Sequence, residues 1–266
     1  MIETVHIDGA PATVEDLSAA LVSNYAAFTT FQHEPGGVRG LDLHLSRLAS
    51  SSLELFGQSV PDARLREFIR TALAGRDERL SVRVQLFLPT ITPRRVDAKG
   101  RPSVLVRVSG PLPELRGPLR LQSQAYQREV PHLKHAATFG LIRAARQART
   151  ASFDDALFVA SDGLISEGSI WNIGFIEGQS VIWPRAPMLA GTGQALIERG
   201  LMAVGLNSET RPVRLDEVGR FDGAFICNSS TAAAPVSTID QTRLNTDPRV
   251  IEWLKAAWAA NPVEAI

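Results

Sequence analysis

The chemistry of this sequence centres on Lys134, in the stretch VPHLKHAATFG over residues 130–140. Three lysines stand among the 28 lysine and arginine residues, so arginine supplies most of the positive charge. A guanidinium stays protonated in proteins, whereas a desolvated lysine amine can lose its proton and then act as a base or form a Schiff base. A lysine retained between two histidines and beside apolar residues is therefore a first indication of a reactive amine, although by its type alone Lys134 also fits an ordinary surface lysine.

Three further stretches carry residue types that catalysis or anion binding needs. Glu167 is a carboxylate within the largely apolar stretch ISEGSIWNIGF. AGTGQALIERG (190–200) places glycines at an expected helix start, where free backbone N–H groups bind anions. CNSST (227–231) supplies hydroxyl and N–H groups after an expected strand. Taken singly, each stretch also fits an ordinary structural role: a turn carboxylate, a flexible helix start and a Ser/Thr turn.

These residues need a scaffold, and the first part of the chain predicts two helices followed by two strands. Apolar spacing and terminal glycines mark the helices, and period-two alternation marks the strands, at 40–57, 62–75, 79–89 and 102–110. The stretch SGPLPELRGPLR (109–120) is rich in proline and glycine, which is typical of a linker. We therefore expect a small N-terminal α/β domain over 1–110, a linker over 111–120 and a larger domain over 121–266.

The second part of the chain predicts more strand than helix. A helix is expected over 141–149, and strands over 155–184 are divided by turns at Asp162-Gly163 and Gly178-Gln179. An amphipathic helix follows over 191–206, and a strand over 223–236 runs into a hydroxyl-rich loop. The whole chain is thus expected to be a mixed α/β protein.

Composition narrows the functional classes. The 266 residues carry 28 basic and 28 acidic side chains, and this neutral balance argues against a nucleic-acid or membrane-surface protein. One cysteine, Cys227, allows no disulfide within a chain, and its apolar strand predicts a buried packing residue. The N-terminal sequence lacks the pattern of a signal peptide, and no apolar run is long enough to span a membrane. We expect a cytoplasmic protein.

In order and spacing, five stretches together resemble the class IV aminotransferases. They are LHLSRL, HLKHAATFG, DDALFVASDGLISEGSIWNIGFIEGQSVIWP, MLAGTGQALIERG and FICNSSTAAAPV, and the resemblance covers roughly residues 28–240. These fold-type IV pyridoxal-phosphate enzymes include branched-chain and D-amino-acid aminotransferases and aminodeoxychorismate lyase. The resemblance implies pyridoxal 5'-phosphate as cofactor, a small N-terminal α/β domain with a larger β-barrel-like C-terminal domain, and a homodimer.

The resemblance also implies roles for single residues. Lys134 matches the lysine that forms a Schiff base with the cofactor, and Glu167 matches the glutamate that faces the pyridine nitrogen. Arg47 matches the phosphate-binding arginine of the family's His-x-x-Arg-Leu helix. The rest of the phosphate site is matched by two pairs, Thr192 with Gly193 and Ser229 with Ser230.

The sequence departs from the family pattern in several places. GTGQ stands where the family often has GITR, so one phosphate-binding hydroxyl is missing, and Ala232 replaces a usual glutamate. On the substrate side, NYAAFTTFQH lacks both glycines of the family's GDGVFET. The candidates for substrate contact are therefore Thr29, Thr30 and Arg83, and a solvated strand position is an equally good explanation of Arg83. No metal site is expected, because His132 and His135 lack a third ligand.

The main hypothesis is a pyridoxal-phosphate-dependent aminotransferase, which moves an amino group between an amino acid or amine and a 2-keto acid. Lys134 would hold the cofactor and move the proton between the substrate Cα and the cofactor. The alternative is aminodeoxychorismate lyase, which eliminates pyruvate, because the threonines after Phe28 resemble that subgroup. A degenerate member that binds a ligand without turnover is a third hypothesis, although the joint presence of Lys134, Glu167 and Arg47 argues against it.

Overall fold

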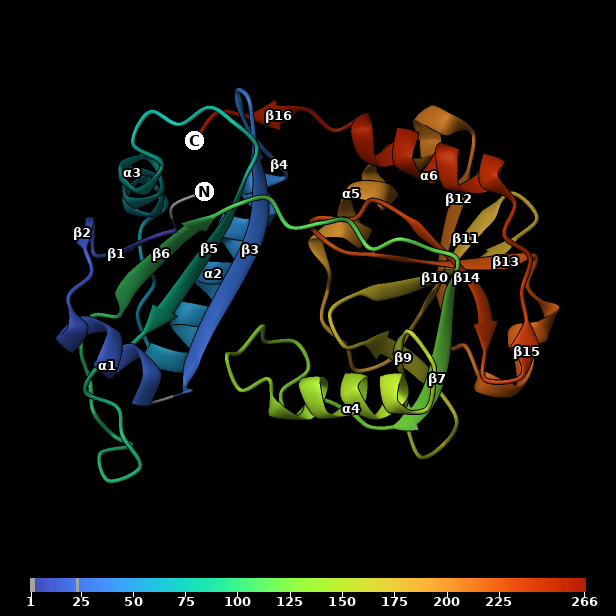
Figure 1. The fold of residues 1–266 in the computed structure, drawn as a ribbon, viewed down its shortest axis with the longest axis horizontal. Coiled ribbons are helices and arrows are strands. Elements are labelled where there is room, and N and C mark those ends of the chain that lie inside the picture. The colour runs from blue at the N-terminus through green and yellow to red at the C-terminus, as the bar shows by residue number, and fades with distance from the viewer. Residues whose placement is uncertain (1–2, 23) are drawn as a thin grey trace. The chain divides into compact units, whose positions relative to one another are not determined.

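The structure is a computed structural model and describes residues 3–22 and 24–266 (Figure 1). It forms two compact units. The first unit consists of the chain up to Leu112 together with the short segments Leu133–Ala137 and Pro262–Ile266. The second unit consists of Pro113–His132 and Thr138–Asn261.

This division differs from a simple cut at the proline-rich stretch. The chain enters the second unit at Pro113 and starts a strand at Leu119, within the predicted linker 111–120. Two later segments return to the first unit because their backbones pair with its strands. His135 pairs antiparallel with Ala27, and Val263 pairs with Arg39. Lys134 therefore belongs structurally to the first unit.

The first unit is built on an antiparallel sheet. Within residues 3–22 and 24–266 it has seven strands, in the order β16-β4-β3-β5-β6-β1-β2. Their bounds are β1 (Thr4–Ile7), β2 (Ala10–Pro11), β3 (Ala26–Glu34), β4 (Gly37–Arg39), β5 (Leu80–Phe87), β6 (Ser103–Ser109) and β16 (Val263–Glu264). Its helices are α1 (Val14–Val22), α2 (Leu41–Phe56) and α3 (Asp62–Leu73). The predictions over 40–57, 62–75, 79–89 and 102–110 are confirmed as α2, α3, β5 and β6.

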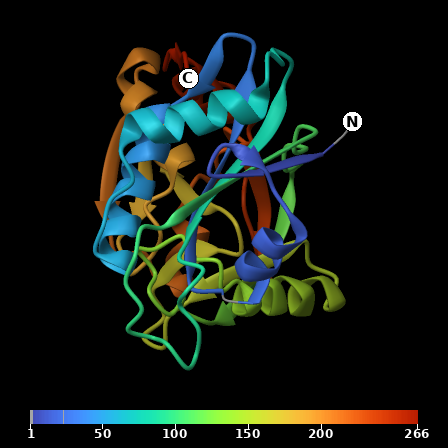
Figure 2. The same ribbon diagram turned by 90° about the vertical axis from the view of Figure 1, so that its left-hand side faces the viewer.

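The two faces of this sheet have different surroundings. Alternate residues such as Phe31, Val82 and Val84 pack with apolar side chains of α2 and α3 into one buried cluster. Helix α2 runs along the sheet, and both helices can be followed in Figures 1 and 2. Their neighbours along the strands, including Thr30 and Arg83, point to the opposite face of the sheet, because successive side chains of a strand alternate between its two faces. This alternation decides which candidate residues share a face.

The second unit is a barrel-like sheet, which confirms the fold class expected from the resemblance. Among the residues that the structure describes, six strands close a ring in the order β10-β13-β14-β7-β8-β9, and the β9–β10 pairing completes it. Strands β11 and β12 continue from β10, and β15 pairs with β14. The bounds are β7 (Leu119–Ala125), β8 (Asp155–Val159), β9 (Ile165–Gly168), β10 (Asn172–Glu177), β11 (Ser180–Pro184), β12 (Asn207–Arg211), β13 (Gly223–Cys227), β14 (Ala234–Ile239) and β15 (Thr242–Arg243).

The helices of the second unit are α4 (Phe139–Thr150), α5 (Thr192–Gly200) and α6 (Pro248–Ala259). The α-helix predicted over 191–206 is shorter than expected, since a 3-10 turn over Leu201–Val204 ends it ahead of Gly205. The strand and the hydroxyl-rich loop predicted within 223–236 are confirmed as β13 and the CNSST loop, and the same stretch also contains the start of β14. Across the described residues, no helix has both the length and the apolar character that a membrane span requires.

Candidate active site

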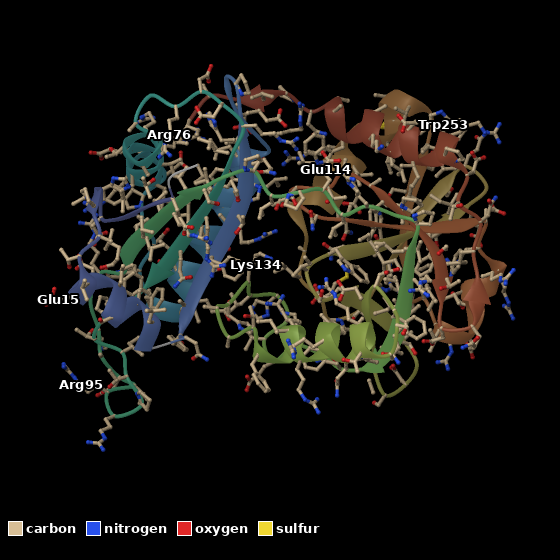
Figure 3. The ribbon with its side chains drawn as sticks, in the orientation of Figure 1. Glu15, Arg76, Arg95, Glu114, Lys134 and Trp253 are labelled. Carbon is tan, nitrogen blue, oxygen red and sulfur yellow. The ribbon has the colours of Figure 1, made fainter. Side chains whose placement is uncertain are left out.

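Lys134 lies on a short segment that extends the sheet of the first unit along β3. The Phe28 N–H donates to the Lys134 carbonyl at 2.9 Å, and the Ala136 N–H donates to the Ala26 carbonyl at 2.8 Å. Side chains directly opposite in an antiparallel pair point to the same face. Accordingly, the Lys134 Nζ lies 5.1 Å from the centroid of the Phe28 ring (Figure 3). The backbone thus fixes where the amine is presented.

Arg83 and Thr30 share this face. The Arg83 guanidinium carbon stacks 3.6 Å from the centroid of the Phe28 ring, and Thr30 is the residue directly opposite Arg83 on β3. Arg83 donates to the Gln85 side-chain oxygen at 2.8 Å. Burial, and then the charge of Arg107, lowers the pKa of Arg83 to about 10. Arg83 is therefore a half-buried cation that still carries its proton at neutral pH.

Thr29 lies on the opposite face of β3 and does not join Thr30. Its hydroxyl oxygen is 2.6 Å from Nδ1 of His44 on α2, and both residues are buried. Burial lowers the pKa of His44 to about 3, and the positive charges of Arg47 and Lys134 act in the same direction, against Asp42. His44 is therefore neutral at pH 7, and the charges of Arg47 and Lys134 both disfavour its protonation. Thr29 takes a place in the interior rather than the substrate-side place expected for it.

Glu167 lies in the second unit at the pair of strands that closes the barrel, directly opposite Asn172. It is buried, and its carboxylate oxygen Oε1 is 3.8 Å from Nη1 of Arg128, which is buried as well. Burial lowers the pKa of Arg128, whereas Glu167 and Tyr126 act to raise it. A buried carboxylate is thus held beside a buried guanidinium, an arrangement that supports a fixed negative charge.

The two loops expected to bind phosphate approach each other within the second unit. A Cβ placed on Gly193 would lie 2.5 Å from the Asn228 carbonyl oxygen, so only a glycine permits this approach. Thr192 is the first residue of α5 and is buried. The first N–H groups of a helix have no partner inside that helix, and they favour anions. Gly193 thereby brings these donors to the Asn228 loop.

Asn228 shapes the loop that carries both candidate serines. Its side-chain oxygen accepts from the Ser230 N–H at 2.9 Å, the Ser230 hydroxyl at 3.0 Å and the Thr231 N–H at 2.8 Å. Ser230 is therefore engaged within its own loop, and Ser229 next to it is half-buried. The loop is held in one conformation by a residue that the sequence analysis did not single out.

The residues of each unit fit pyridoxal phosphate in their chemistry. The first unit offers a fixed amine at Lys134 and a guanidinium at Arg47. The second offers a buried carboxylate at Glu167 and a close-packed pair of donor loops at Gly193, whose approach a Cβ would prevent. A ring nitrogen that must carry a proton needs such a carboxylate, and a phosphate needs such donors.

Three residues of these arrangements were not predicted as site residues: Arg128, His44 and Asn228. Arg128 resembles any other arginine of an arginine-rich chain, and its burial beside Glu167 follows only from the fold. His44 is the histidine of the His-x-x-Arg-Leu motif that carries Arg47, but its hydrogen bond to Thr29 follows only from the contact between β3 and α2. Asn228 lies in the hydroxyl-rich stretch CNSST, and its role follows only from the packing of Gly193 against its backbone.

The remaining candidates have structural surroundings. Cys227 is fully buried in an apolar cluster of the second unit, and burial raises the pKa of its thiol above the usual range. This confirms the predicted packing role. In the part of the chain that the structure describes, no three or more His, Cys, Asp or Glu side chains are grouped as a metal would require.

Comparisons with known proteins show the family to which the chain belongs. The family model of the amino-transferase class IV proteins matches residues 26–239. A probable branched-chain-amino-acid aminotransferase of Rickettsia felis is 26% identical over 110 residues, which is 40% of this chain. That match spans 38% of the length of the curated relative.

Solved structures show the same fold over nearly the whole chain. A fold IV transaminase from Curtobacterium pusillum matches with a TM-score of 0.80 at 24% identity, covering 98% of this chain and 100% of its own. A hypothetical aminotransferase from Mycobacterium tuberculosis, in its PLP-bound form, has a TM-score of 0.78 at 22% identity, covering 97% and 99%. At these identities the likeness establishes the architecture.

Proposed function

Since the chain belongs to the class IV aminotransferase family, we propose that it is a pyridoxal-phosphate-dependent aminotransferase. It transfers an amino group between an amino acid or amine and a 2-keto acid. The family match over residues 26–239 contains every candidate residue, from Thr29 to Ser230. The observation that carries the proposal is the placement of Lys134, a rare lysine whose backbone is bonded to β3 so that its amine lies beside Phe28 and Arg83.

In the first unit, we assign Lys134 to covalent attachment and proton transfer. Lys134 Nζ takes the proton from the substrate Cα and returns a proton later in the cycle. Arg47 binds the phosphate of the cofactor, and neutral His44 holds the helix that carries it. Arg83 and Thr30 lie on the face of Lys134 and are assigned to the substrate carboxylate, because a half-buried guanidinium binds a carboxylate through two parallel hydrogen bonds. Thr29 supports His44.

In the second unit, the Glu167 carboxylate, with Arg128 beside it, would hold the pyridine nitrogen of the cofactor and keep that nitrogen protonated. The donors of Thr192, Gly193, Ser229 and Ser230 complete phosphate binding. The cofactor, when bound, supplies an electron sink that stabilises negative charge on the substrate carbon.

Reductive trapping tests the attachment site. The protein incubated with pyridoxal phosphate and reduced with borohydride should carry a pyridoxyl group on Lys134. The other two lysines are internal controls, because Lys99 is exposed on a loop and Lys255 is exposed beside Glu252. The Lys134→Arg variant keeps a cation and should remain unlabelled. Label on Lys99 or Lys255 alone would refute the assignment.

Lyase activity remains a second candidate, favoured by the placement of Thr30 on the face of Lys134, in the stretch that resembles the lyase subgroup. The two activities differ in their need for an acceptor. Incubation with aminodeoxychorismate and no keto acid should leave that compound unchanged if the protein is a transaminase. Release of pyruvate and aminobenzoate would establish the lyase instead.

We also propose that the protein is a cytoplasmic homodimer. A single buried cysteine is typical of a reducing compartment. Large apolar side chains are exposed in the single chain. They include Phe139 and Ile142, three residues apart on α4, and Met202 on the turn after α5. Exposed apolar groups of this kind are typical of interfaces between subunits. Sedimentation analysis of the holoenzyme should give twice the mass of 28.8 kDa.

A further inference from the structure

Asp155, at the start of β8, is a buried carboxylate with an unusual set of partners. One oxygen, Oδ2, accepts from the Ser169 hydroxyl at 2.7 Å and from the Trp171 indole N–H at 2.8 Å. The other oxygen, Oδ1, accepts from the Ala156 N–H at 2.8 Å. Asp155 is 6% exposed, and its donors here are uncharged. A carboxylate withdrawn from water in this way costs free energy unless donors saturate it, so its presence needs a reason.

Two of these donors belong to the turn after β9, the strand that carries Glu167. Residues 169–171 connect β9 to β10, and the Gly168 N–H donates to the Trp171 carbonyl at 2.9 Å across that turn. A Cβ on Gly168 would lie 2.2 Å from the Trp171 ring, so the indole lies flat against the Gly168 backbone. Through Ser169 and Trp171, Asp155 therefore fastens the turn from the neighbouring strand β8.

We propose that Asp155 is a positioning residue that sets the direction of the Glu167 carboxylate. Glu167 is the last residue but one of β9, and its backbone direction depends on the turn that starts two residues later, at Ser169. Its ladder partner is Asn172, the first residue on the far side of the same turn. Because Ser169 and Trp171 are hydrogen-bonded to Asp155, the turn is fixed. The Glu167 carboxylate then keeps its direction toward the proposed position of the ring nitrogen. This inference rests on the proposed cofactor.

The chemistry requires an aspartate at this position rather than its amide. All three donors point at the two oxygens, so both oxygens act as acceptors. An asparagine would turn an NH₂ group either toward the Ala156 N–H or toward the Ser169 and Trp171 donors. Either orientation places donor against donor and leaves a buried N–H unsatisfied, which is a large local penalty. Asp155→Asn therefore releases the turn while keeping the volume of the side chain.

The affinities of two ligands test the direction of Glu167 independently of turnover. One ligand is pyridoxal phosphate, and the other is its analogue with a C–H in place of the ring nitrogen, so the two differ only where Glu167 is proposed to bind. Apo-protein binding to both is measured by fluorescence titration. Asp155→Asn should weaken pyridoxal phosphate about tenfold and the analogue by less than about twofold. Glu167→Gln should abolish the preference of the protein for pyridoxal phosphate over the analogue. Adding Asp155→Asn to Glu167→Gln should then change neither affinity further.

Asp154→Asn is the matched control, because Asp154 precedes Asp155 directly, is only half-buried, and accepts from the Arg120 N–H at 2.7 Å. It should leave both affinities unchanged. Ser169→Ala removes one donor only and should weaken pyridoxal phosphate by about threefold, so it carries the test if Asp155→Asn does not fold.

Equal weakening of both ligands, or of neither, would overturn the positioning role. In that event the wild-type protein would still prefer pyridoxal phosphate over the analogue, and the proposed function would stand. If the wild-type protein binds pyridoxal phosphate no better than the analogue, the assignment of Glu167 fails and the inference fails with it. If it binds neither, the proposed function fails.

Discussion

The hydroxyl oxygen of Thr29 and Nδ1 of His44 lie 2.6 Å apart in the interior of the first unit, and this bond links a strand to a helix. Thr29 belongs to β3, whose backbone is hydrogen-bonded to that of Lys134. His44 belongs to α2, which also contains Arg47 one turn further on. The His44 ring also packs 5.1 Å from the ring of Phe31. One hydrogen bond thus connects the two elements that present the proposed cofactor amine and the proposed phosphate-binding arginine.

The first prediction concerns the acid stability of this contact. Because the pKa of His44 falls from 6.5 to about 3 on folding, the unfolded chain binds the proton more readily between these values. His44 therefore stabilises the fold fully above pH 6.5, and this contribution is lost as the pH falls toward 3. The slope reaches at most about 1.4 kcal/mol per pH unit.

His44→Gln removes the titrating group and retains a partner for Thr29, so it isolates this effect. Urea unfolding of both proteins should give a difference in the free energy of unfolding that is constant from about pH 7 to 8 and shrinks at about pH 5. A difference that stays the same at all three values would show that His44 does not titrate between them.

The fold of this chain was largely predictable wherever one face of an element is buried and the other is not. Helices α2 and α3 and strands β5 and β6 show such periodicity, and the sequence analysis located all four. Strand β3 gave no such signal. Seven of the eight residues from Ala26 to His33 are buried, so burial hardly alternates along this strand. A strand buried on both faces carries no period of two.

The sequence alone indicated the candidate reactive residues of the site, but not the residues that surround and position them. Lys134 and Glu167 stand in stretches of unusual composition, which single them out. Arg128 has no such context, since its meaning comes from burial beside Glu167. Thr29 and Thr30 were treated as one pair, yet neighbours on a strand face opposite ways. Recognition of β3 as a strand would have separated them.

The second prediction concerns the buried pair of Arg128 and Glu167. Arg128→Met replaces the guanidinium with an apolar side chain of similar length, and it leaves Glu167 buried without its cation. Loss of one partner from a buried pair costs about 3–5 kcal/mol, so the free energy of unfolding should fall by about that amount. Combining Arg128→Met with Glu167→Gln should recover most of the loss, because the double variant buries no charge.

Arg249→Met is the matched control for that experiment. Arg249 pairs with Asp247 at 2.7 Å, but the Arg249 side chain is 80% exposed. A surface pair contributes about 0–1 kcal/mol, so this variant should change the free energy of unfolding by less than about 1 kcal/mol. Equal losses from Arg128→Met and Arg249→Met, measured by urea unfolding, would remove the case for a buried pair.

The third prediction tests Arg83 as the group that binds the substrate carboxylate. Arg83→Gln should raise KM for amino-acid donors by about 10- to 100-fold, since a hydrogen bond to a charged group contributes about 1.5–3 kcal/mol. Donors that are simple amines have no carboxylate and should keep their KM. Arg101→Gln, an exposed change beside β6, is the control and should alter neither class. Equal losses for amines and amino acids would instead indicate a role in the fold.

The fourth prediction concerns Gly193, where two effects of opposite sign compete. Gly193 is the second residue of α5, and an alanine inside a helix is favoured over glycine by about 1 kcal/mol. The added Cβ, however, would lie 2.5 Å from the Asn228 carbonyl oxygen and 2.7 Å from its carbon, which are backbone atoms and cannot rotate away. Forced backbone shifts of this kind cost about 1–3 kcal/mol, so the steric term prevails.

Gly193→Ala should therefore lower the free energy of unfolding and separate the two donor loops. Because those loops are proposed to bind phosphate, the variant should weaken pyridoxal phosphate about tenfold and leave the affinity for pyridoxal, which lacks the phosphate, unchanged. Gly219→Ala is the control, since its Cβ would meet Thr242 at an ordinary 3.5 Å. If both ligands weaken equally, the close approach of α5 to Asn228 serves the fold alone, and the phosphate must be bound through other residues.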